Sequence, residues 1–331
     1  MKVLVTGGGG FLGKHIVELL LARGDEVTSI ARSDYPELRE LGAQTVRGDL
    51  GDRDAVMAAA AGHDAIIHTA AKVGMWGDHE DFIRINVGGT QNLLDACAEH
   101  GIERFVFTSS PSVTFDGGHA ENAGQDTPYP ATFMASYPET KAAAEQLVLA
   151  ANSPTLRTTS LRPHLIWGPG DPHLIPRLID RAKKGRLRIV GDGQNKVDIT
   201  FVDNAARAHI DALDALDRPD DQPNPRGKAY FISNDEPVML WPWINDLLGE
   251  LEIKPVKKRL SHNFAHQLGS TMEQAWRMLN LKGEPLMTRF IAGQLATSHW
   301  YDMKPARRDL GYDPQVSMDE GMKLLLADLK G

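Results

Sequence analysis

Tyr137 and Lys141 stand four residues apart, so that in a helix both side chains project from one face. A free phenol has a pKa of about 10 and exchanges protons poorly at neutral pH. A lysine ammonium nearby favours the phenolate and lowers that pKa, which makes the tyrosine a usable general acid and base. Ser110, at the end of a predicted strand, supplies a hydroxyl that would hold a substrate oxygen beside the phenol. The spacing predicts proton transfer to or from that oxygen, although Tyr-x-x-x-Lys also occurs by chance as a surface pair.

A glycine-rich turn near the start of the chain predicts the second reactant, a dinucleotide. The apolar run Val3–Val5 leads to Gly7, Gly10 and Gly13, and a helical pattern follows directly. In this GxxGxxG spacing the first glycine makes the tight turn, the second admits backbone N–H groups to a pyrophosphate, and the third lets the helix lie close to the strand. The helix N-terminus also favours an anion. An ordinary strand–helix turn is the alternative, but this context favours a cofactor held by Gly7, Gly10, Phe11, Leu12 and Gly13.

The residues after the second predicted strand, Glu26–Ile30, bear on the choice between NAD and NADP. In sheets of this type an acidic residue near that strand end receives the ribose 2′-OH of NAD. Ala31 and Arg32 occupy that place, so the carboxylate is missing and a guanidinium is adjacent. A guanidinium suits a 2′-phosphate. The pattern favours NADP(H) over NAD(H), unless Arg32 is only a solvated loop residue.

Two further strand ends supply candidate cofactor contacts, because the carboxyl ends of parallel strands form the ligand edge of a sheet. Asp49 follows the predicted strand Gln44–Arg47 and either accepts from an adenine amino group or caps the helix near Asp52. After the strand Asp64–His68, small residues let the chain pass close beneath a cofactor. The candidates at these two ends are Asp49, Leu50, Ala70, Ala71 and Lys72.

Asn86 lies in a long predicted helix, Asp78–His100, on its inner side. A buried amide needs hydrogen-bond partners. Asn86 therefore either holds a water or backbone group near the active site or satisfies a helix kink beside Gly88–Gly89. Cys97 on the same helix is most simply a small core residue.

Strand and helix patterns alternate through about residue 165, which predicts an α/β fold: a Rossmann-type, doubly wound parallel sheet. A loop over residues 111–135 is long enough to face the substrate or act as a lid. Beyond residue 165 the alternation loosens and helical patterns dominate. We therefore expect a dinucleotide-binding domain of residues 1–165, to which 203–232 return, and a smaller substrate lobe made of 166–202 and 233–331.

The composition is typical of a globular enzyme: 331 residues, of which 42% are hydrophobic and 24% charged. The net charge of −8 argues against nucleic acid as the main partner. Cys97 is the only cysteine, which suits a reducing compartment. The first strand begins at Lys2, so we expect no leader peptide, and no apolar run approaches the ~18 residues of a membrane span. These features predict a cytoplasmic enzyme acting on a small molecule without a metal, and they leave open a homodimer and contacts with other enzymes of its pathway.

Together these stretches resemble the extended short-chain dehydrogenase/reductase family over the whole chain. The matching segments are Thr6–Gly13, Asp49–Leu50, His68–Ala71, Asn86–Thr90, Thr108–Ser110, Tyr137–Lys141 and Arg162–Pro163. The resemblance implies that Tyr137 is the general acid–base and that Lys141 binds the nicotinamide ribose and lowers the pKa of Tyr137. It also implies that Ser110 orients the substrate oxygen and that Asn86 supports a proton relay. Residues after Pro163 would contact the nicotinamide carboxamide.

Within that family the chain resembles the 3β-hydroxysteroid dehydrogenase-like branch. Dehydratases carry an acidic pair after the strand-five hydroxyl residue, where this chain has Pro111 and Ser112. Sugar-nucleotide epimerases usually carry an Arg-Asp-aromatic triplet that binds diphosphate, where this chain reads Asn195–Asp198. A narrower resemblance is to bacterial reductases of 2-alkyl-3-oxoalkanoates in long-chain olefin biosynthesis. The segments that carry it are Ala71–Lys72, Trp76–Gly77, Asn195–Asn204, Thr288–Phe290 and His299–Tyr301.

The resemblance implies an NADP-dependent oxidoreductase that reduces the 3-keto group of a large apolar substrate, foremost a 2-alkyl-3-oxoalkanoate, to a hydroxyl. The alternatives are a 3β-hydroxysteroid or carboxysterol dehydrogenase, an NAD-dependent sugar-nucleotide epimerase and an NADP-sensing regulator, which generally lacks the Tyr–Lys pair. A substrate carboxylate needs a cationic neighbour, and the candidates are Lys72, His164, His173 and Arg177. The side chains that would line an alkyl channel, or else form ordinary core, are Met75, Trp76, Phe133, Met134, Trp167, Met287 and Phe290.

Overall fold

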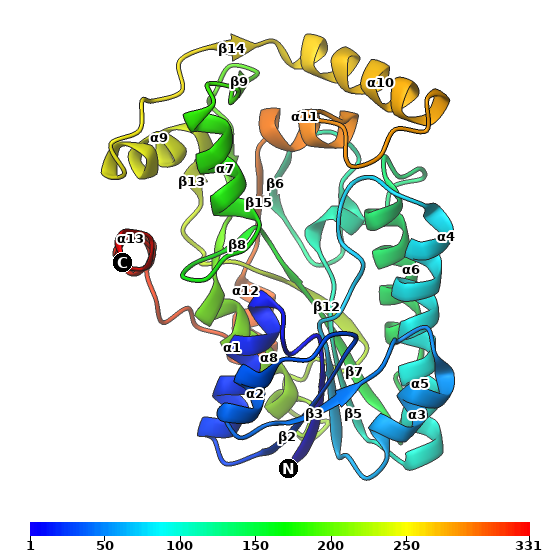
Figure 1. The fold of residues 1–331 in the computed structure, drawn as a ribbon. Helices are drawn as coiled ribbons and strands as arrows, with labels where there is room; N and C mark the ends of the chain where they lie inside the picture. Colours follow the sequence, from blue (N-terminus) through cyan, green and yellow to red (C-terminus); the bar gives the residue numbers. More distant parts are fainter.

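Seven strands form the central sheet, in the order β12-β7-β5-β4-β1-β2-β3 (Figure 1). The computed structural model describes residues 1–331. The strands of this sheet are β1 Lys2–Thr6, β2 Glu26–Ala31, β3 Gln44–Arg47, β4 Ala65–His68, β5 Arg104–Thr108, β7 Arg157–Pro163 and β12 Lys228–Ile232. All six pairings between them are parallel, which confirms the predicted doubly wound, Rossmann-type sheet.

Helices cover both faces of this sheet, as parallel strands buried on two sides require. On β1, Val3 and Val5 belong to one apolar core and Leu4 to another, because successive side chains point to opposite faces. The first core also takes side chains from α1 Phe11–Ala22, α2 Pro36–Glu40, α8 Val202–Ala215 and α12 Lys304–Leu310. The second takes side chains from α3 Arg53–Ala60, α5 Gly89–His100 and α6 Ser136–Ala150.

A second, smaller lobe lies beyond the carboxyl ends of these strands, at the top of Figure 1. Its helices are α7 Leu174–Lys183, α9 Leu240–Glu250, α10 His262–Met278, α11 Arg289–Ala296 and α13 Met318–Lys330. Its four-stranded sheet has the order β13-β10-β15-β6, with β6 Ala120–Ala123, β10 Lys196–Val197, β13 Val238–Met239 and β15 His299–Tyr301. Two-stranded pairs complete it: β8 Ile166–Trp167 with β11 Thr200–Phe201, and β9 Ile189–Val190 with β14 Arg259–Leu260. Buried Trp167, Phe201 and Trp241 fill its core.

Two segments cross back from the second lobe to the first. Helix α8 packs on α1, and β12 pairs with β7 at the edge of the large sheet. We expected residues 303–312 in the substrate lobe. Instead, Met303, Leu310 and Tyr312 pack in the core on one face of the large sheet. The division into two lobes stays a prediction. No helix of the structure is both long and apolar enough to cross a bilayer.

Local structure differs from the sequence prediction in two places. The long helix predicted over 78–100 is α4 His79–Phe82, a π-helical turn over Ile83–Gly88 and then α5. The loop 111–135 contains a 3₁₀ turn, Pro111–Thr114, and strand β6, which pairs with β15 across 179 residues of sequence separation and could not be read from local pattern.

Candidate active site

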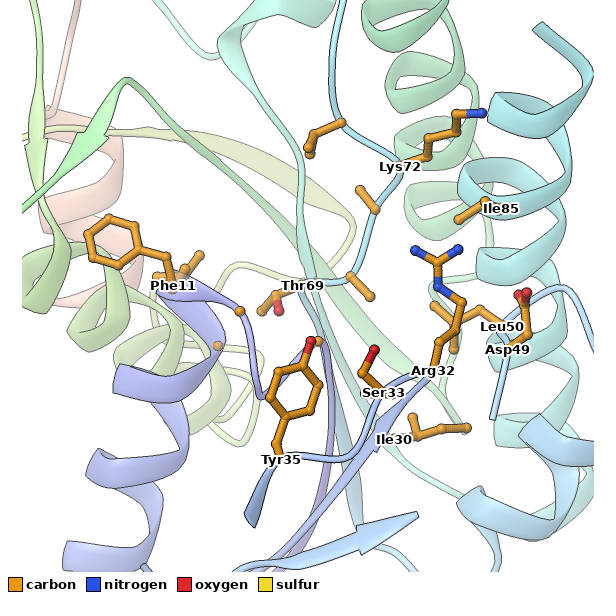
Figure 2. A pocket seen from close by; sticks show the side chains of 18 of the residues that line it. Phe11, Ile30, Arg32, Ser33, Tyr35, Asp49, Leu50, Thr69, Lys72 and Ile85 are labelled. Atoms are coloured by element: carbon orange, nitrogen blue, oxygen red, sulfur yellow. The ribbon is translucent and has the colours of Figure 1, made fainter. Parts of the chain in front are cut away.

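A cavity of about 320 Å³ opens where the glycine turn meets the carboxyl ends of β1, β2 and β4 (Figure 2). Gly7 has a φ of +72°, a backbone conformation that suits glycine. A Cβ on Gly13 would stand 2.1 Å from the carbonyl oxygen of Gly7, so any side chain there would push α1 off the turn. The cradle therefore depends on the absence of side chains, as a pyrophosphate site requires.

Most predicted cofactor contacts meet in this one cavity. Its lining includes Gly7, Gly10, Phe11, Leu12, Gly13, Arg32, Asp49, Leu50, Ala70, Ala71 and Lys72. Pro163 does not line it, and Tyr137 and Lys141 lie on α6. Ser33, Tyr35, Thr69 and Ile85 also line the cavity and were not predicted. A Cβ on Gly9 would stand 2.4 Å from the Tyr35 ring. The extra glycine in the turn could therefore have indicated that a bulky side chain packs against it.

Charge in the cavity is concentrated near the ends of β2 and β3. Figure 2 shows the Arg32 guanidinium reaching into the space beside Asp49, and no carboxylate forms an ion pair with it. Asp49 Oδ1 instead accepts from Gly51 N at 2.9 Å and from Arg84 Nη1 at 3.3 Å. The hydrogen bond from Gly51, followed by the charge of Arg84, lowers the pKa of Asp49 despite its partial burial. Asp49 is thus an ionised acceptor, and Arg32 is a cation free to meet an anion.

The predicted proton-transfer pair lies on α6, with both side chains on one helix face. Lys141 Nζ donates to the carbonyl oxygen of Thr108 at 2.5 Å and lies 4.0 Å from the centre of the Phe107 ring. Burial lowers the pKa of Lys141 to about 7, while Glu145 acts to raise it. Burial raises the pKa of Tyr137, and a hydrogen bond with the Ser110 side chain lowers it. The expected lowering of the Tyr137 pKa by Lys141 is therefore not seen here, because desolvation of the phenol dominates.

Ser110 lies two residues after β5 and caps the 3₁₀ turn that follows. Its Oγ accepts from Ser112 N at 3.2 Å and from Ser112 Oγ at 2.9 Å. Because both contacts use its lone pairs, its own O–H proton remains available to donate. The hydrogen bond that lowers the pKa of Tyr137 thus comes from a serine side chain with a free donor.

Asn86 lies in the π-helical turn and is 2% exposed. Its Oδ1 accepts from Lys72 N at 2.7 Å, and its Nδ2 donates to Lys72 O and to Thr140 Oγ1, both at 3.1 Å. The Asn86 amide therefore links the backbone of Lys72, in the cavity lining, to Thr140 of α6, which lies between Tyr137 and Lys141 in the sequence. Each alternative for Asn86 is met in part. Its side chain holds backbone groups of Lys72, as the first expects, and it lies in an irregular helical turn, as the second expects. π-turns are frequent at functional sites.

His68 extends the same hydrogen-bonded chain to the glycine turn. Its Nδ1 pairs with Thr6 Oγ1 at 2.7 Å and its Nε2 with Thr90 Oγ1 at 3.0 Å. Burial, together with the charge of Lys141, holds the pKa of His68 well below its ordinary value, so the ring is neutral. Since Thr90 Oγ1 donates to Asn86 O, the floor of the cavity is one connected network.

A buried ion pair beneath the site was not predicted. Arg162 contacts Glu145 through Nη2 at 2.6 Å and through Nε at 3.0 and 3.2 Å. Glu145 also accepts from Tyr129 Oη and Ser160 Oγ. Burial alone would raise the pKa of Glu145, but Arg162 and the Tyr129 hydroxyl lower it, so the carboxylate is ionised. Glu145 follows Lys141 by four residues, and that spacing was the available signal.

The four candidate partners for a substrate carboxylate separate in the structure. Lys72 Nζ already pairs with Asp81 at 2.7 Å, and buried His164 pairs with His299 at 2.7 Å. Burial, then the neighbouring His299, keeps the pKa of His164 well below its ordinary value, so it is not a cation. His173 lines the cofactor cavity, and Arg177 is exposed with Glu284 at 3.5 Å. These contacts argue against His164, whereas Lys72 and His173 both line the cofactor cavity.

Comparison with known proteins places the whole chain among reductases and dehydrogenases. Residues 4–261 match the 3-beta hydroxysteroid dehydrogenase/isomerase family. A 2-alkyl-3-oxoalkanoate reductase of Stenotrophomonas maltophilia (strain K279a) is 52% identical, covering 99% of both chains. One of Shewanella oneidensis is 45% identical, covering 98% of this chain and 85% of its own. The human decarboxylating sterol-4-alpha-carboxylate 3-dehydrogenase is 36% identical, covering 97% of this chain and 86% of its own.

Solved structures share the architecture. The crystal structure of gox2253 superposes with a TM-score of 0.78 at 26% identity, covering 99% of this chain and 97% of its own. MoeE5 in complex with UDP-glucose and NAD gives a TM-score of 0.74 at 26% identity, covering 100% and 99%. The likeness extends over both lobes, so the cofactor edge and the second lobe are arranged alike.

Proposed function

The chain belongs to the 3-beta hydroxysteroid dehydrogenase/isomerase family, and from that premise we propose that it reduces the 3-keto group of a 2-alkyl-3-oxoalkanoate with NADPH. It is an NAD(P)-dependent oxidoreductase of the extended short-chain dehydrogenase/reductase type. The observation that carries the proposal is the full-length 52% identity to a 2-alkyl-3-oxoalkanoate reductase, joined to a Tyr137–Lys141–Ser110 site beside a dinucleotide cradle.

The residues of the cavity fit a nicotinamide dinucleotide. Gly7, Gly10 and Gly13 leave room for a pyrophosphate at the start of α1. Asp49 is an ionised acceptor at the place expected for the adenine amino group. Arg32 would hold the 2′-phosphate of NADP, because a guanidinium binds phosphate through two parallel N–H donors and no carboxylate already occupies it. NADP(H) is therefore favoured over NAD(H).

The side chains on α6 and just after β5 supply the proton chemistry. The bound nicotinamide supplies hydride to the 3-keto carbon. The Tyr137 hydroxyl donates its proton to the keto oxygen, so that the C=O double bond is replaced by one C–H and one O–H bond. Ser110 donates a hydrogen bond to the same oxygen with the proton that its contacts to Ser112 leave free. The family resemblance implies that Lys141 stabilises the phenolate, which regains its proton from solvent.

Asn86 would hold the network through which that proton returns. Its contacts to Lys72 and Thr140 fix the helix on which Tyr137 and Lys141 stand. Pro163 ends β7, and the backbone after it would contact the nicotinamide carboxamide. Both roles follow from the family resemblance.

Sterol carboxylates are the second candidate class, for a chemical reason. A 3-hydroxysterol-4-carboxylate and a 2-alkyl-3-hydroxyalkanoate share one unit, a hydroxyl on the carbon next to the one that carries the carboxylate. The human relative at 36% identity is named for the sterol substrate. The greater identity to the reductases favours the open-chain acid.

A sugar nucleotide fits less well. Val197 is fully buried on β10, and Lys196 lies 5.0 Å from the centre of the Trp300 ring, where an epimerase would carry its diphosphate-binding arginine. Lysine binds a diphosphate only as a point charge, without the bidentate geometry of arginine. An NADP-sensing regulator would not need the proton-transfer site on α6.

A substrate panel tests the proposal. Purified enzyme with NADP⁺ is given a 2-alkyl-3-hydroxyalkanoate, a 3β-hydroxysterol-4-carboxylate or UDP-glucose, and NADPH formation is followed by absorbance, with UDP-galactose measured separately. We expect the open-chain acid to have the highest kcat/KM. Epimerisation of UDP-glucose would overturn the assignment, and tight NADPH binding with no turnover of any acid would favour a regulator.

Three further properties remain proposals. The net charge and single buried cysteine support a cytoplasmic location, and nothing in the fold prevents a homodimer or contact with other enzymes of the pathway. Sedimentation of the purified protein would determine its oligomeric state.

A further inference from the structure

A second cavity, of about 360 Å³, lies inside the smaller lobe. Its walls come from α7, α9, α11 and the residues that follow β7. Ten of its fourteen lining residues are hydrophobic, and among them Leu174 and Leu178 of α7 face Ile244 of α9 and Ile291 of α11. None of the fourteen is acidic. The cavity is therefore an apolar space in a part of the chain that the proton chemistry does not use.

This cavity adjoins the cofactor site. His173 lines both cavities, at the residue just before α7. Leu165 also lines the apolar cavity and follows Pro163 by two residues, close to the backbone proposed to meet the nicotinamide carboxamide. Leu165 has a φ of +41°, a strained conformation for a leucine. The apolar space thus shares His173 with the cofactor cavity and extends from there between the helices of the smaller lobe.

We infer that this cavity holds an alkyl chain of the substrate, with the carboxylate near His173 and the chain between α7 and α11. The inference rests on the proposed function. The two arginines of the lining, Arg177 and Arg181, both lie on α7, and Arg177 is exposed and pairs with Glu284 at 3.5 Å. Each methylene that leaves water for this cavity would make the binding free energy of the chain more favourable.

The neighbouring hollow beneath α10 is the competing location. It has about 590 Å³ and includes Met75, Trp76 and Met134, which the sequence suggested as an alkyl channel. Its lining also carries four charged residues: Asp78, Glu273, Arg277 and Glu284. An alkyl chain there would strip water from charges without replacing their partners, which is unfavourable. Two other candidates, Trp167 and Phe290, are buried in core contacts instead.

Binding of straight-chain alkanoates to the NADP⁺-loaded enzyme tests the inference without requiring turnover. Calorimetry across a series of chain lengths should give a Kd that falls by about fourfold per added methylene until the cavity is full, the fold-change equivalent to about 0.8 kcal/mol. Leu178→Trp should fill the cavity and flatten this dependence. Leu178→Ala should keep the dependence and extend it to longer chains.

Leu281→Trp is the matched control, because Leu281 lines the hollow beneath α10 and not the apolar cavity. It should leave the chain-length dependence as in the unmodified enzyme. If Leu178→Trp does not bind NADP⁺, Ile291→Trp blocks the same cavity from α11. A Kd independent of chain length, or one flattened by Leu281→Trp alone, overturns the inference. Chain-length-dependent binding without oxidation of any 2-alkyl-3-hydroxyalkanoate would instead overturn the proposed function.

Discussion

Lys141 is buried beside an aromatic ring and a backbone carbonyl, and at the scale of single residues its charge depends on its neighbours. Burial brings its pKa to about 7, and Glu145, one helical turn further along α6, acts in the opposite direction. Glu145 can do so because Arg162 and the Tyr129 hydroxyl keep it ionised although it is fully buried. The charge of Lys141 thus depends on a third residue of the same helix face, Glu145. Glu145 in turn stays ionised because it pairs with Arg162 of β7.

Tyr137→Phe removes the hydroxyl that we propose protonates the keto oxygen. We expect kcat to fall by at least about 10²-fold, since general acid–base catalysis contributes about 10²–10⁴-fold, while NADPH affinity changes little. Stopped-flow turnover and fluorescence titration with NADPH measure the two quantities separately. Lys141→Ala should weaken both. A Tyr137→Phe enzyme with near-native kcat would exclude Tyr137 from the proton transfer.

Arg32 is expected to determine cofactor choice. The double substitution Ala31→Asp with Arg32→Gln places a carboxylate for the ribose 2′-OH and removes the guanidinium for the phosphate. The ratio of kcat/KM for NADPH to that for NADH should fall by at least about tenfold, which corresponds to about 1.4 kcal/mol. Arg47→Gln serves as the control, because Arg47 Nε is engaged with Arg32 O outside the cofactor cavity. An unchanged ratio would mean that the 2′-phosphate is bound elsewhere.

At the scale of elements, the sequence predicted features that depend on neighbouring residues but not contacts between distant ones. The glycine turn, α6 and the strand ends were predictable because each depends on residues close in sequence. The buried pair His164–His299 spans 135 residues, and Met303 and Tyr312 enter the sheet core from what reads as the second lobe. Such contacts depend on topology, so local periodicity did not predict them. The apolar cavity was missed for the same reason, since its walls come from helices far apart in sequence.

Asp198, between β10 and β11, should give a pH signature. Its Oδ2 accepts from Tyr301 N at 2.8 Å, and its Oδ1 is buried without a hydrogen-bond partner. Burial raises its pKa to about 7. A carboxyl whose folded pKa exceeds its unfolded value near 3.8 stabilises the fold below that value, and this stability is lost as pH rises toward 7.

Asp198→Asn removes this ionisation while keeping the shape of the side chain. Between pH 5 and 7 the variant should gain stability over the unmodified protein by up to about 1.4 kcal/mol per pH unit. Urea unfolding at several pH values measures the difference, with the exposed Asp126→Asn as control. Parallel pH profiles for Asp198→Asn and the unmodified protein would show that Asp198 does not titrate in this range.

At the scale of the whole molecule, the large sheet separates two apolar cores, and the chain crosses it repeatedly. Helices α8 and α12 and strand β12 come from late in the sequence yet complete the N-terminal layer. The first core therefore cannot form until residues beyond 300 are present. Cys97 lies in the other core, 1% exposed, on the face covered by α3, α5 and α6. The single thiol thus reports on a layer assembled entirely from the first half of the chain.

Labelling of Cys97 should follow opening of the whole fold. Burial raises the pKa of its thiol to about 12, so a thiol reagent that needs the thiolate reacts only when α5 leaves the core. The cofactor cavity draws on Leu50, which packs in the same core, and bound NADPH should therefore hold this layer closed. At free NADPH of about 100 times Kd the labelling rate should fall by about 100-fold, and Cys97→Ala should show no labelling. A rate insensitive to NADPH would show instead that α5 opens locally, independently of the cofactor cradle, and that the second core is less cooperative than its packing indicates.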